Sequence, residues 1–490
     1  MDAHLSIADL MDSSGVGFGT SGARGLATAM TGRVCYAYTA AFLAHLRARG
    51  EAAPGTRVAL AGDLRPSTPR ILEACASAIA DAGCTPVHCG TIPTPAVANY
   101  GLREGVPSLM VTGSHIPDDR NGIKFYRASG EILKDDEAGI RAQRVAVPAG
   151  RFDDDGALRA PGALPPASDA AHRAYVRRYL DFFPAGCLAG RRVALYEHST
   201  VAREAFAAVL AALGAEVVPL GRSDRFVPVD TEAIRPEDVA LAGHWAREVG
   251  FDAIVSADGD GDRPLVGDAQ GRWLRGDVAG IHAARYLDAD AVVTPVSSNT
   301  ALEKCGWFPT IVRTRIGSPY VIAGMQAAAG RRVVGYEANG GFLTQSDIAR
   351  DGRTLPALPT RDAVVVALAV LGLASQEGLT VAGLAGLLPP RYTASDRLKD
   401  FPTALSTARL TALQAGGAPA IEEVFAADFG RVASIDATDG LRITFASGEI
   451  AHLRASGNAP ELRCYAEAGS ADRAEAVTRR CLAILDTWRG

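Results

Sequence analysis

The sequence predicts a multidomain α/β protein that ends in a smaller α+β domain. Strand patterns alternate with helical patterns, as where a strand expected at 57–62 precedes a helix expected at 70–82. The chain has 490 residues, which is more than one hydrophobic core supports. After Arg391 the apolar residues recur with period two, as in a half-exposed antiparallel sheet. We therefore expect three α/β domains with parallel or mixed sheets, followed by an α+β domain.

The expected domains are 1–150, 170–288, 289–390 and 391–490, and a Pro-, Gly- and Asp-rich linker is predicted at 145–170. Strands are expected at 57–62, 86–90, 106–111, 123–126, 192–196, 215–220, 251–256, 291–294, 332–335, 434–440, 441–445 and 461–467. Helices are expected at 34–49, 70–82, 94–100, 171–183, 202–213, 363–374 and 470–486. The three α/β domains share size and layout but no convincing residue-level repeat.

Composition restricts the classes of partner. Apolar residues make up 48% of the chain, charged residues 21%, and the net charge of -5 argues against nucleic acid or an acidic membrane as the main partner. No signal peptide is apparent, and the apolar run at 363–374 is shorter than the about 18 residues that a membrane span needs. The eight cysteines form no C-x-x-C pair. We expect reduced, structural cysteines in a cytoplasmic protein.

The loop 112–126 follows an expected strand, at the sheet edge where α/β proteins bind ligands. Gly113 allows a sharp turn before Ser114 and His115, and Lys124 stands on the apolar run that returns from the loop. A Ser-His pair alone is more often ordinary loop polarity. Its functional interpretation depends on the other loops.

Asp258, Asp260 and Asp262 alternate with glycines directly after the expected strand 251–256. Three carboxylates that converge are costly without a cation, and oxygen ligands favour Mg²⁺ or Ca²⁺ over zinc. A calcium loop of the EF-hand type is excluded because its sixth and twelfth positions would be Arg263 and Ala269. A solvated acidic turn is the alternative. We favour a metal site with room for a phosphoryl oxygen.

A glycine-rich segment near the N-terminus matches G-x-G-x-x-G at Gly17, Gly19 and Gly22. No apolar strand precedes it, and no acidic residue lies between Arg24 and Glu51 to bind a ribose, so a dinucleotide site is disfavoured. A loop whose backbone N–H groups and Arg24 approach a phosphate fits better.

Two later loops carry ligand-binding side chains. Glu337 and Asn339 offer the acceptor and donor that vicinal sugar hydroxyls need, although an ordinary turn is equally compatible. Arg454, Ser456 and Asn458 suit a phosphate, with a surface turn as the alternative. Taken together, the loops predict phosphoryl transfer on a phosphosugar.

These segments, in this order, resemble the motifs of the α-D-phosphohexomutases, the family of phosphomannomutases and phosphoglucomutases. The resemblance covers nearly the whole chain and rests on Gly19–Gly25, Thr112–His115, Asp258–Arg263, Glu337–Gly341 and Arg454–Asn458. It implies four domains around a central cleft, an Mg²⁺ cofactor and a small phosphosugar as the partner, in a monomer or homodimer.

The resemblance also implies residue roles. Ser114 would be the phosphoserine and a metal ligand with Asp258, Asp260 and Asp262. Arg24, His115 and Lys124 would assist phosphoryl and proton transfer, with the division between His115 and Lys124 left open. Substrate contacts are expected from Arg263, Glu337, Asn339, Arg454, Ser456, Gly457 and Asn458.

The implied reaction interconverts mannose 6-phosphate and mannose 1-phosphate through a hexose 1,6-bisphosphate. Ile116 departs from the usual catalytic motif, but Ser114 and Lys124 remain, so activity is still expected. The departures at Asn339 and Asn458 affect the identity of the sugar more than the reaction type. A phosphoglucomutase or a dual-specificity enzyme is therefore the alternative, and a non-catalytic phosphosugar-binding protein is the alternative from another class. A serine hydrolase would need the Gly-x-Ser-x-Gly turn, which Ser114 lacks.

Overall fold

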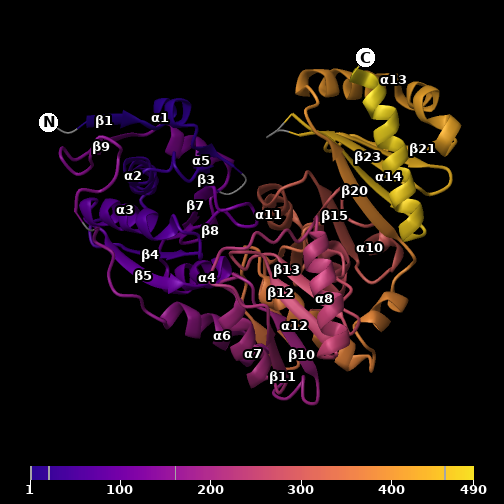
Figure 1. Ribbon diagram of the computed structural model, residues 1–490, viewed down its shortest axis with the longest axis horizontal. Coiled ribbons are helices and arrows are strands. Elements are labelled where there is room, and N and C mark those ends of the chain that lie inside the picture. The colour runs from indigo at the N-terminus through magenta and orange to yellow at the C-terminus, as the bar shows by residue number, and fades with distance from the viewer. Residues whose placement is uncertain (1–2, 20–21, 161, 457–459, 490) are drawn as a thin grey trace. The chain divides into compact units, whose positions relative to one another are not determined.

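The computed structural model describes residues 3–19, 22–160, 162–456 and 460–489 (Figure 1). The chain divides into two compact units, one formed by 1–290 with 329–384 and the other by 291–328 with 385–490. Within the described residues, no helix combines the length and the apolar character needed to cross a membrane. All eight cysteines are free thiols, as predicted.

The N-terminal sheet of the first unit has the strand order β2-β3-β7-β6-β4-β5. Strand β4 pairs in parallel with β5 and β6, whereas β7 is antiparallel to β6 and β3. The sheet is mixed because the chain between β6 and β7 is too short for a crossover helix. Its strands are β2 (Gly17–Phe18), β3 (Gly22–Leu26), β4 (Arg57–Gly62), β5 (Thr85–Thr91), β6 (Ser108–Val111), β7 (Arg120–Arg127) and β8 (Gly130–Glu131).

The helices of this region are α1 (Ile7–Ser14), α2 (Gly32–Ala48), α3 (Thr68–Asp81), α4 (Thr94–Glu104) and α5 (Lys134–Arg141). Phe42 of α2 and Phe125 of β7 lie in the core between helix and sheet, with ring centroids 4.9 Å apart. Strand β1 (Ala3–Ser6) pairs antiparallel with β9 (Arg144–Val147). The predicted linker was therefore wrong at its start, because residues 145–147 belong to a strand.

A second sheet in the first unit has the order β11-β10-β12-β13. Strand β10 is parallel to β11 and β12, and β13 is antiparallel to β12 because only residues 258–263 separate them. The elements are α6 (Ala170–Phe182), β10 (Arg192–Tyr196), α7 (Arg203–Ala212), β11 (Glu216–Leu220), α8 (Pro236–Glu248), β12 (Ala253–Ala257), β13 (Pro264–Asp268) and α9 (Gly276–Tyr286).

The first unit also contains the hairpins β16 (Val333–Tyr336) with β17 (Phe342–Thr344) and β18 (Ile348–Arg350) with β19 (Arg353–Leu355). Helix α12 (Ala363–Gln376) is the predicted buried helix and packs against α9. Asp362 caps it by accepting hydrogen bonds from the N–H groups of Val364 and Val365.

The second unit begins with the parallel pair β14 (Ala291–Pro295) and β15 (Thr310–Thr314), with α10 (Ala301–Lys304) and α11 (Ser318–Ala327). Its C-terminal sheet has the order β20-β24-β23-β22-β21 and is antiparallel. A 3-10 turn (Ala382–Leu387) includes the residue at which the first unit ends. The remaining elements of the second unit are β20 (Tyr392–Leu398), α13 (Thr403–Phe429), β21 (Val432–Asp436), β22 (Leu441–Phe445), β23 (Ile450–Ala455), β24 (Leu462–Ala468), α14 (Ala471–Asp486) and a final turn (Thr487–Arg489).

Helix α14 lies along the C-terminal sheet (Figure 1), where it packs mainly on β20 and β24, and Val477 and Cys481 belong to the same core as Leu441 and Ile443. The opposite face of β22 presents Arg442 and Thr444. Helix α13 was not predicted, since it bends at Gly417 (φ 60°) and contains Pro419. The predicted class, α/β domains with mixed sheets and a terminal α+β domain, is confirmed.

Candidate active site

Ser114 lies just beyond the end of β6 and is buried. Its φ is 60°, an uncommon value for serine that neighbouring contacts must hold in place. The Ser114 N–H donates to Oγ1 of Thr112 at 2.8 Å, and the Ser114 hydroxyl donates to Oδ2 of Asp258 at 2.7 Å. The backbone conformation therefore directs the hydroxyl at the acidic loop that follows β12.

The side chain of Arg65 stabilises the turn at Ser114, a contact that was not predicted from the sequence. Its guanidinium donates to the carbonyl of Ser114 at 2.9 Å and to that of Ile116, pairs with Asp63, and lies 4.0 Å from the ring centroid of Phe226. A Cβ at Gly113 would lie 2.8 Å from Cζ of Arg65, so only glycine allows this approach.

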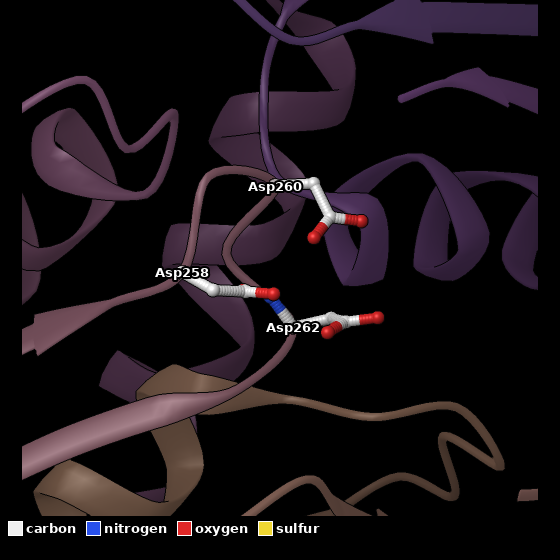
Figure 2. A group of neighbouring side chains, drawn as sticks. All are labelled: Asp258, Asp260 and Asp262. Carbon is white, nitrogen blue, oxygen red and sulfur yellow. The ribbon is translucent and has the colours of Figure 1, made fainter. Parts of the chain in front are cut away.

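The acidic loop brings Asp258, Asp260 and Asp262 together, with one oxygen of each within 4.8 Å of the others. In Figure 2 the three side chains extend from the curled loop into one region. The curl needs glycine, since Gly261 has φ 72° and a Cβ at Gly259 would lie 2.8 Å from the carbonyl oxygen of Ser114. The acidic loop therefore packs closely against the turn that carries Ser114.

Buried cations balance these carboxylates. The Lys124 ammonium lies 2.6 Å from Oδ2 of both Asp260 and Asp262. Arg361 places Nη2 2.9 Å from Oδ2 of Asp262 and Nη1 3.3 Å from Oε2 of Glu337. Three acids and two cations therefore form one buried network in the first unit.

The network leaves oxygens free for a metal. Thr94 donates its hydroxyl to Oδ2 of Asp260 at 2.6 Å and its N–H to the Asp260 carbonyl at 2.9 Å. Oδ1 of Asp260 and Oδ1 of Asp262 are buried and accept no hydrogen bond from the described residues. Buried oxygens without a donor, beside a serine hydroxyl, fit a hard divalent cation such as Mg²⁺.

The electrostatics of the acidic loop also favour a cation. Burial, with repulsion from Asp260 and Asp262, raises the pKa of Asp258 well above its usual range. Burial also opposes ionisation of Asp260, but attraction to Lys124 and its hydrogen bond lower the pKa of Asp260 overall. A divalent cation would relieve the repulsion that acts on Asp258.

His115 lies in a strongly positive environment. Burial, followed by the charges of Arg263 and Arg24, lowers the pKa of His115 to about 2. Its Nδ1 accepts a hydrogen bond from Nη1 of Arg263 at 2.7 Å, so the neutral ring carries its proton on Nε2. Burial and the charge of Arg263 likewise lower the pKa of Arg24 to about 10. This excess of positive charge suits an anion.

Glu337 and Asn339 lie on the loop between β16 and β17. Oδ1 of Asn339 accepts from the N–H of Gly341 at 2.9 Å, and its carbonyl accepts from the Thr231 hydroxyl at 2.7 Å. Nδ2 of Asn339 donates to no acceptor among the described residues. The loop is held by Asn339 while its amide N–H₂ remains available.

The predicted phosphate loop lies in the second unit. Nε of Arg454, on β23, is 3.0 Å from Oδ1 of Asp439, whose Oδ2 accepts from the N–H of Ile316 at 2.9 Å. The Ser456 N–H donates to the carbonyl of Glu461 at 2.9 Å. The predicted Gly457 and Asn458 lie outside the described residues.

The structure joins most of the predicted residues into one cluster in the first unit. The predicted members of this cluster are Arg24, Ser114, His115, Lys124, Asp258, Asp260, Asp262, Arg263 and Glu337. Gly17 and Gly22 lie in the hairpin of β2 and β3, which agrees with the rejection of a dinucleotide site.

Sequence reasoning missed Asp63, Arg65, Thr94 and Arg361. Of these four residues, only Arg361 could have been suspected from the sequence, because it is a charged residue directly before the N-cap of a strongly apolar helix.

Four family models match the chain. They are described as phosphoglucomutase/phosphomannomutase, alpha/beta/alpha domain I at residues 15–146, domain II at 175–271, domain III at 275–392, and the C-terminal domain at 407–483. The chain is 45% identical to a phosphomannomutase of Sinorhizobium fredii over 96% of this chain and 98% of that relative.

Solved structures of low identity share the fold. A phosphoglucomutase/phosphomannomutase family protein from Burkholderia thailandensis is 20% identical with a TM-score of 0.72, covering 96% of this chain and 97% of that one. N-acetylphosphoglucosamine mutase of Aspergillus fumigatus, in complex with GlcNAc-6P and magnesium, is 13% identical with a TM-score of 0.58, covering 99% and 100%.

Proposed function

The chain belongs to the phosphoglucomutase/phosphomannomutase family, and we propose that within it the protein is a phosphomannomutase. As an isomerase it interconverts mannose 6-phosphate and mannose 1-phosphate through a phosphoserine and a hexose 1,6-bisphosphate. The observation that carries this proposal is the Ser114 hydroxyl, 2.7 Å from a buried loop of three carboxylates. The named activity of the Sinorhizobium fredii relative supports the choice of mannose.

Ser114, Asp258, Asp260 and Asp262 are the residues that would hold Mg²⁺. When bound, the ion supplies positive charge to the oxygens of the transferring phosphoryl group. The donor set supports this assignment, since it consists of oxygen atoms alone and two of the buried carboxylate oxygens have no hydrogen bond from the described residues.

Phosphoryl transfer breaks the bond between phosphorus and Oγ of Ser114 and forms one to a sugar hydroxyl oxygen. The proton of that hydroxyl must finally reach Oγ. Lys124 suits this relay because its ammonium lies in the same buried network, 2.6 Å from two carboxylates. His115 suits it less, since Arg263 occupies its Nδ1 and its pKa is lowered to about 2. We assign Nε2–H of His115, with Arg24 and Arg263, to hydrogen bonds with phosphoryl oxygens.

We assign sugar recognition to Glu337 and Asn339, and the non-reacting phosphate to Arg454 and Ser456 with Gly457 and Asn458. The bisphosphate would then turn over, so that each of its phosphates meets Ser114 once per cycle. Phosphoglucomutase or dual specificity remains the alternative, because the same loops would accept either epimer. Hexose 1,6-bisphosphate as activator, the monomeric or homodimeric state and the cytoplasmic location stay predictions.

The test combines turnover with mapping of the modification. Mannose 1-phosphate and glucose 1-phosphate are compared as substrates with Mg²⁺ and glucose 1,6-bisphosphate, for the unaltered chain and Ser114→Ala. We expect higher kcat/KM for mannose, phosphate on the peptide that contains Ser114, and a loss of at least about a thousandfold in Ser114→Ala. Preference for glucose would overturn the mannose assignment alone. Ligand binding without isomerisation, unchanged in Ser114→Ala, would indicate the non-catalytic alternative.

A further inference from the structure

The second unit contains a cavity of about 320 Å³ between α10, β15 and the polar face of the C-terminal sheet. Its charged lining residues are Glu303, Lys304, Arg313, Arg391, Asp436 and Arg442. Four of these six are cations. Their N–H donors differ in how many acceptors they already have.

Every N–H donor of the Arg313 guanidinium already has an acceptor. Its Nε and Nη2 donate to the Glu303 carboxylate at 2.8 Å each, and its Nη1 donates to the carbonyls of Pro295 and Ser298 at 2.9 Å. A further bond from Nη2 reaches the carbonyl of Asn299 at 3.2 Å. All five N–H donors of this guanidinium are used, so Arg313 and Glu303 form a wall of the cavity.

Arg391 is partly used. Its Nε donates to Glu467, and its Nη2 donates to the carbonyl of Gly448 at 2.8 Å. Glu467 also accepts hydrogen bonds from the N–H and the hydroxyl of Thr300, so both of its carboxylate oxygens already have donors. Nη1 of Arg391 has no acceptor among the described residues.

Arg442 differs from Arg313 and Arg391 because its guanidinium has no acceptor among the described residues. It alternates on β22 with the core residues Leu441 and Ile443, so its side chain projects from the polar face with Thr444. The described residues give its guanidinium no hydrogen bond. Its strand partner Asp436 instead accepts from the N–H of Thr438 at 2.8 Å. Burial, then the charge of Arg313, lowers the pKa of Arg442, and the charges of Glu467, Asp436 and Glu303 only partly oppose this lowering.

We propose that this cavity binds the phosphate group of a small molecule through Arg442, Nη1 of Arg391, Lys304 and Thr444. Planar guanidinium groups match pairs of phosphate oxygens, and a hydroxyl and an ammonium complete the donor set. A volume of about 320 Å³ admits inorganic phosphate or a compact phosphomonoester. The site uses different residues from Arg454 and Ser456, and it does not depend on the proposed function.

The first test measures how phosphate protects the arginines of the unaltered chain from chemical modification. Phenylglyoxal modifies accessible arginines, and peptide mass spectrometry follows each one separately. We expect inorganic phosphate at about ten times its dissociation constant to slow modification of Arg442 about tenfold. Arg480, half-exposed on α14 across the sheet, should react at the same rate with and without phosphate. Equal rates at Arg442 in both conditions would overturn the proposal.

The second test is calorimetric titration with inorganic phosphate and, separately, with a hexose 6-phosphate. Arg442→Gln should weaken one binding event at least about tenfold, whereas the matched Arg480→Gln should leave it unchanged. Tighter binding of the hexose phosphate would identify a phosphomonoester as the occupant, and tighter binding of inorganic phosphate would identify the free ion. Phosphate binding that survives in Arg442→Gln but disappears in Arg454→Ala would place all binding in the phosphate loop and overturn the proposal.

Discussion

The acidic loop after β12 and the predicted phosphate loop, which begins with Arg454 near the end of β23, pair their charged side chains in different ways. In the first unit, the side chains of Asp260 and Asp262 are at most 1% exposed and share Lys124, which is 6% exposed. In the second unit, Arg454 forms an ion pair with Asp439 among the described residues, and their side chains are 21% and 8% exposed. The first loop is a closed network and the second a single, partly solvated pair.

The difference in burial fits the roles that we propose for the two loops. Buried charges are tolerated only when every partner is in place, so the acidic loop has little freedom, which suits a site that must align reacting atoms. A partly exposed guanidinium costs less to keep unoccupied, which suits a proposed phosphate contact that forms and breaks in every cycle.

The largest expected effect is on the closed network. Lys124→Met leaves Asp260 and Asp262 facing each other without their shared cation, and we expect a loss of about 3–5 kcal/mol in the free energy of unfolding, measured by urea titration. Lys134→Met is the matched control, because Lys134 is 53% exposed and forms an ion pair with Glu137 at the protein surface. Its effect should remain within about 0.5 kcal/mol. Similar losses in both variants would contradict the contrast between the loops.

The second prediction concerns the open pair. Arg454→Gln should raise KM for a hexose phosphate about 10- to 100-fold, with a smaller change in kcat, because it removes ground-state binding of a phosphate. Its free energy of unfolding should change by less than about 1 kcal/mol. Steady-state kinetics and urea titration measure the two quantities. A loss of stability as large as that of Lys124→Met would show that this loop is also a closed network.

The third prediction separates two threonines behind the acidic loop. The Thr94 hydroxyl donates to the Asp260 carboxylate at 2.6 Å, whereas the Thr200 hydroxyl donates to the carbonyl of Asp258 at 2.7 Å and accepts from the N–H of Ala202 at 3.2 Å. Thr94→Val should weaken Mg²⁺ binding about tenfold in calorimetric titration, because a charged acceptor loses its donor. Thr200→Val should have a smaller effect, and Thr94→Ser should restore binding. If Thr94→Val binds Mg²⁺ like the unaltered chain, Thr94 does not position Asp260.

The smallest effect is a pH dependence common to both loops. Nε2 of His198 donates to the carbonyl of Ala257 at 2.8 Å, and Nε2 of His452 donates to that of Asp439 at 2.5 Å. Burial lowers both pKa values from 6.5 to about 4. The folded state therefore resists protonation, and stability present above pH 6.5 is lost as the pH falls towards 4.

For each histidine, we expect the free energy of unfolding to be about 1 kcal/mol lower at pH 5.5 than at pH 8. The variants His198→Gln and His452→Gln keep a donor for the carbonyl but cannot be protonated, so each should flatten the dependence of unfolding free energy on pH. An unchanged slope in either variant would show that the histidine it replaces does not titrate in this window.

Much of the reaction centre could be read from local patterns. A strand followed by Gly113-Ser114, or by carboxylates alternating with glycines at 258–262, specifies its own turn because glycine permits the curl and the strand sets its starting point. Lys124 followed from its place on the apolar run after the serine turn. Helix α13 could not be predicted in this way, since Gly417 and Pro419 interrupt the helical pattern and only packing against the sheet compensates for them.

By itself, the sequence determined the fold class, the turn that carries Ser114 and the acidic loop, because each depends on residues close together in the chain. The tertiary structure decided which charges meet. Arg65, Thr94 and Arg361 reach the reaction centre from separate elements, and no local pattern records such contacts. It also decided between His115 and Lys124 as the better proton relay in our proposal, because burial and the charge of Arg263 act through space rather than along the chain.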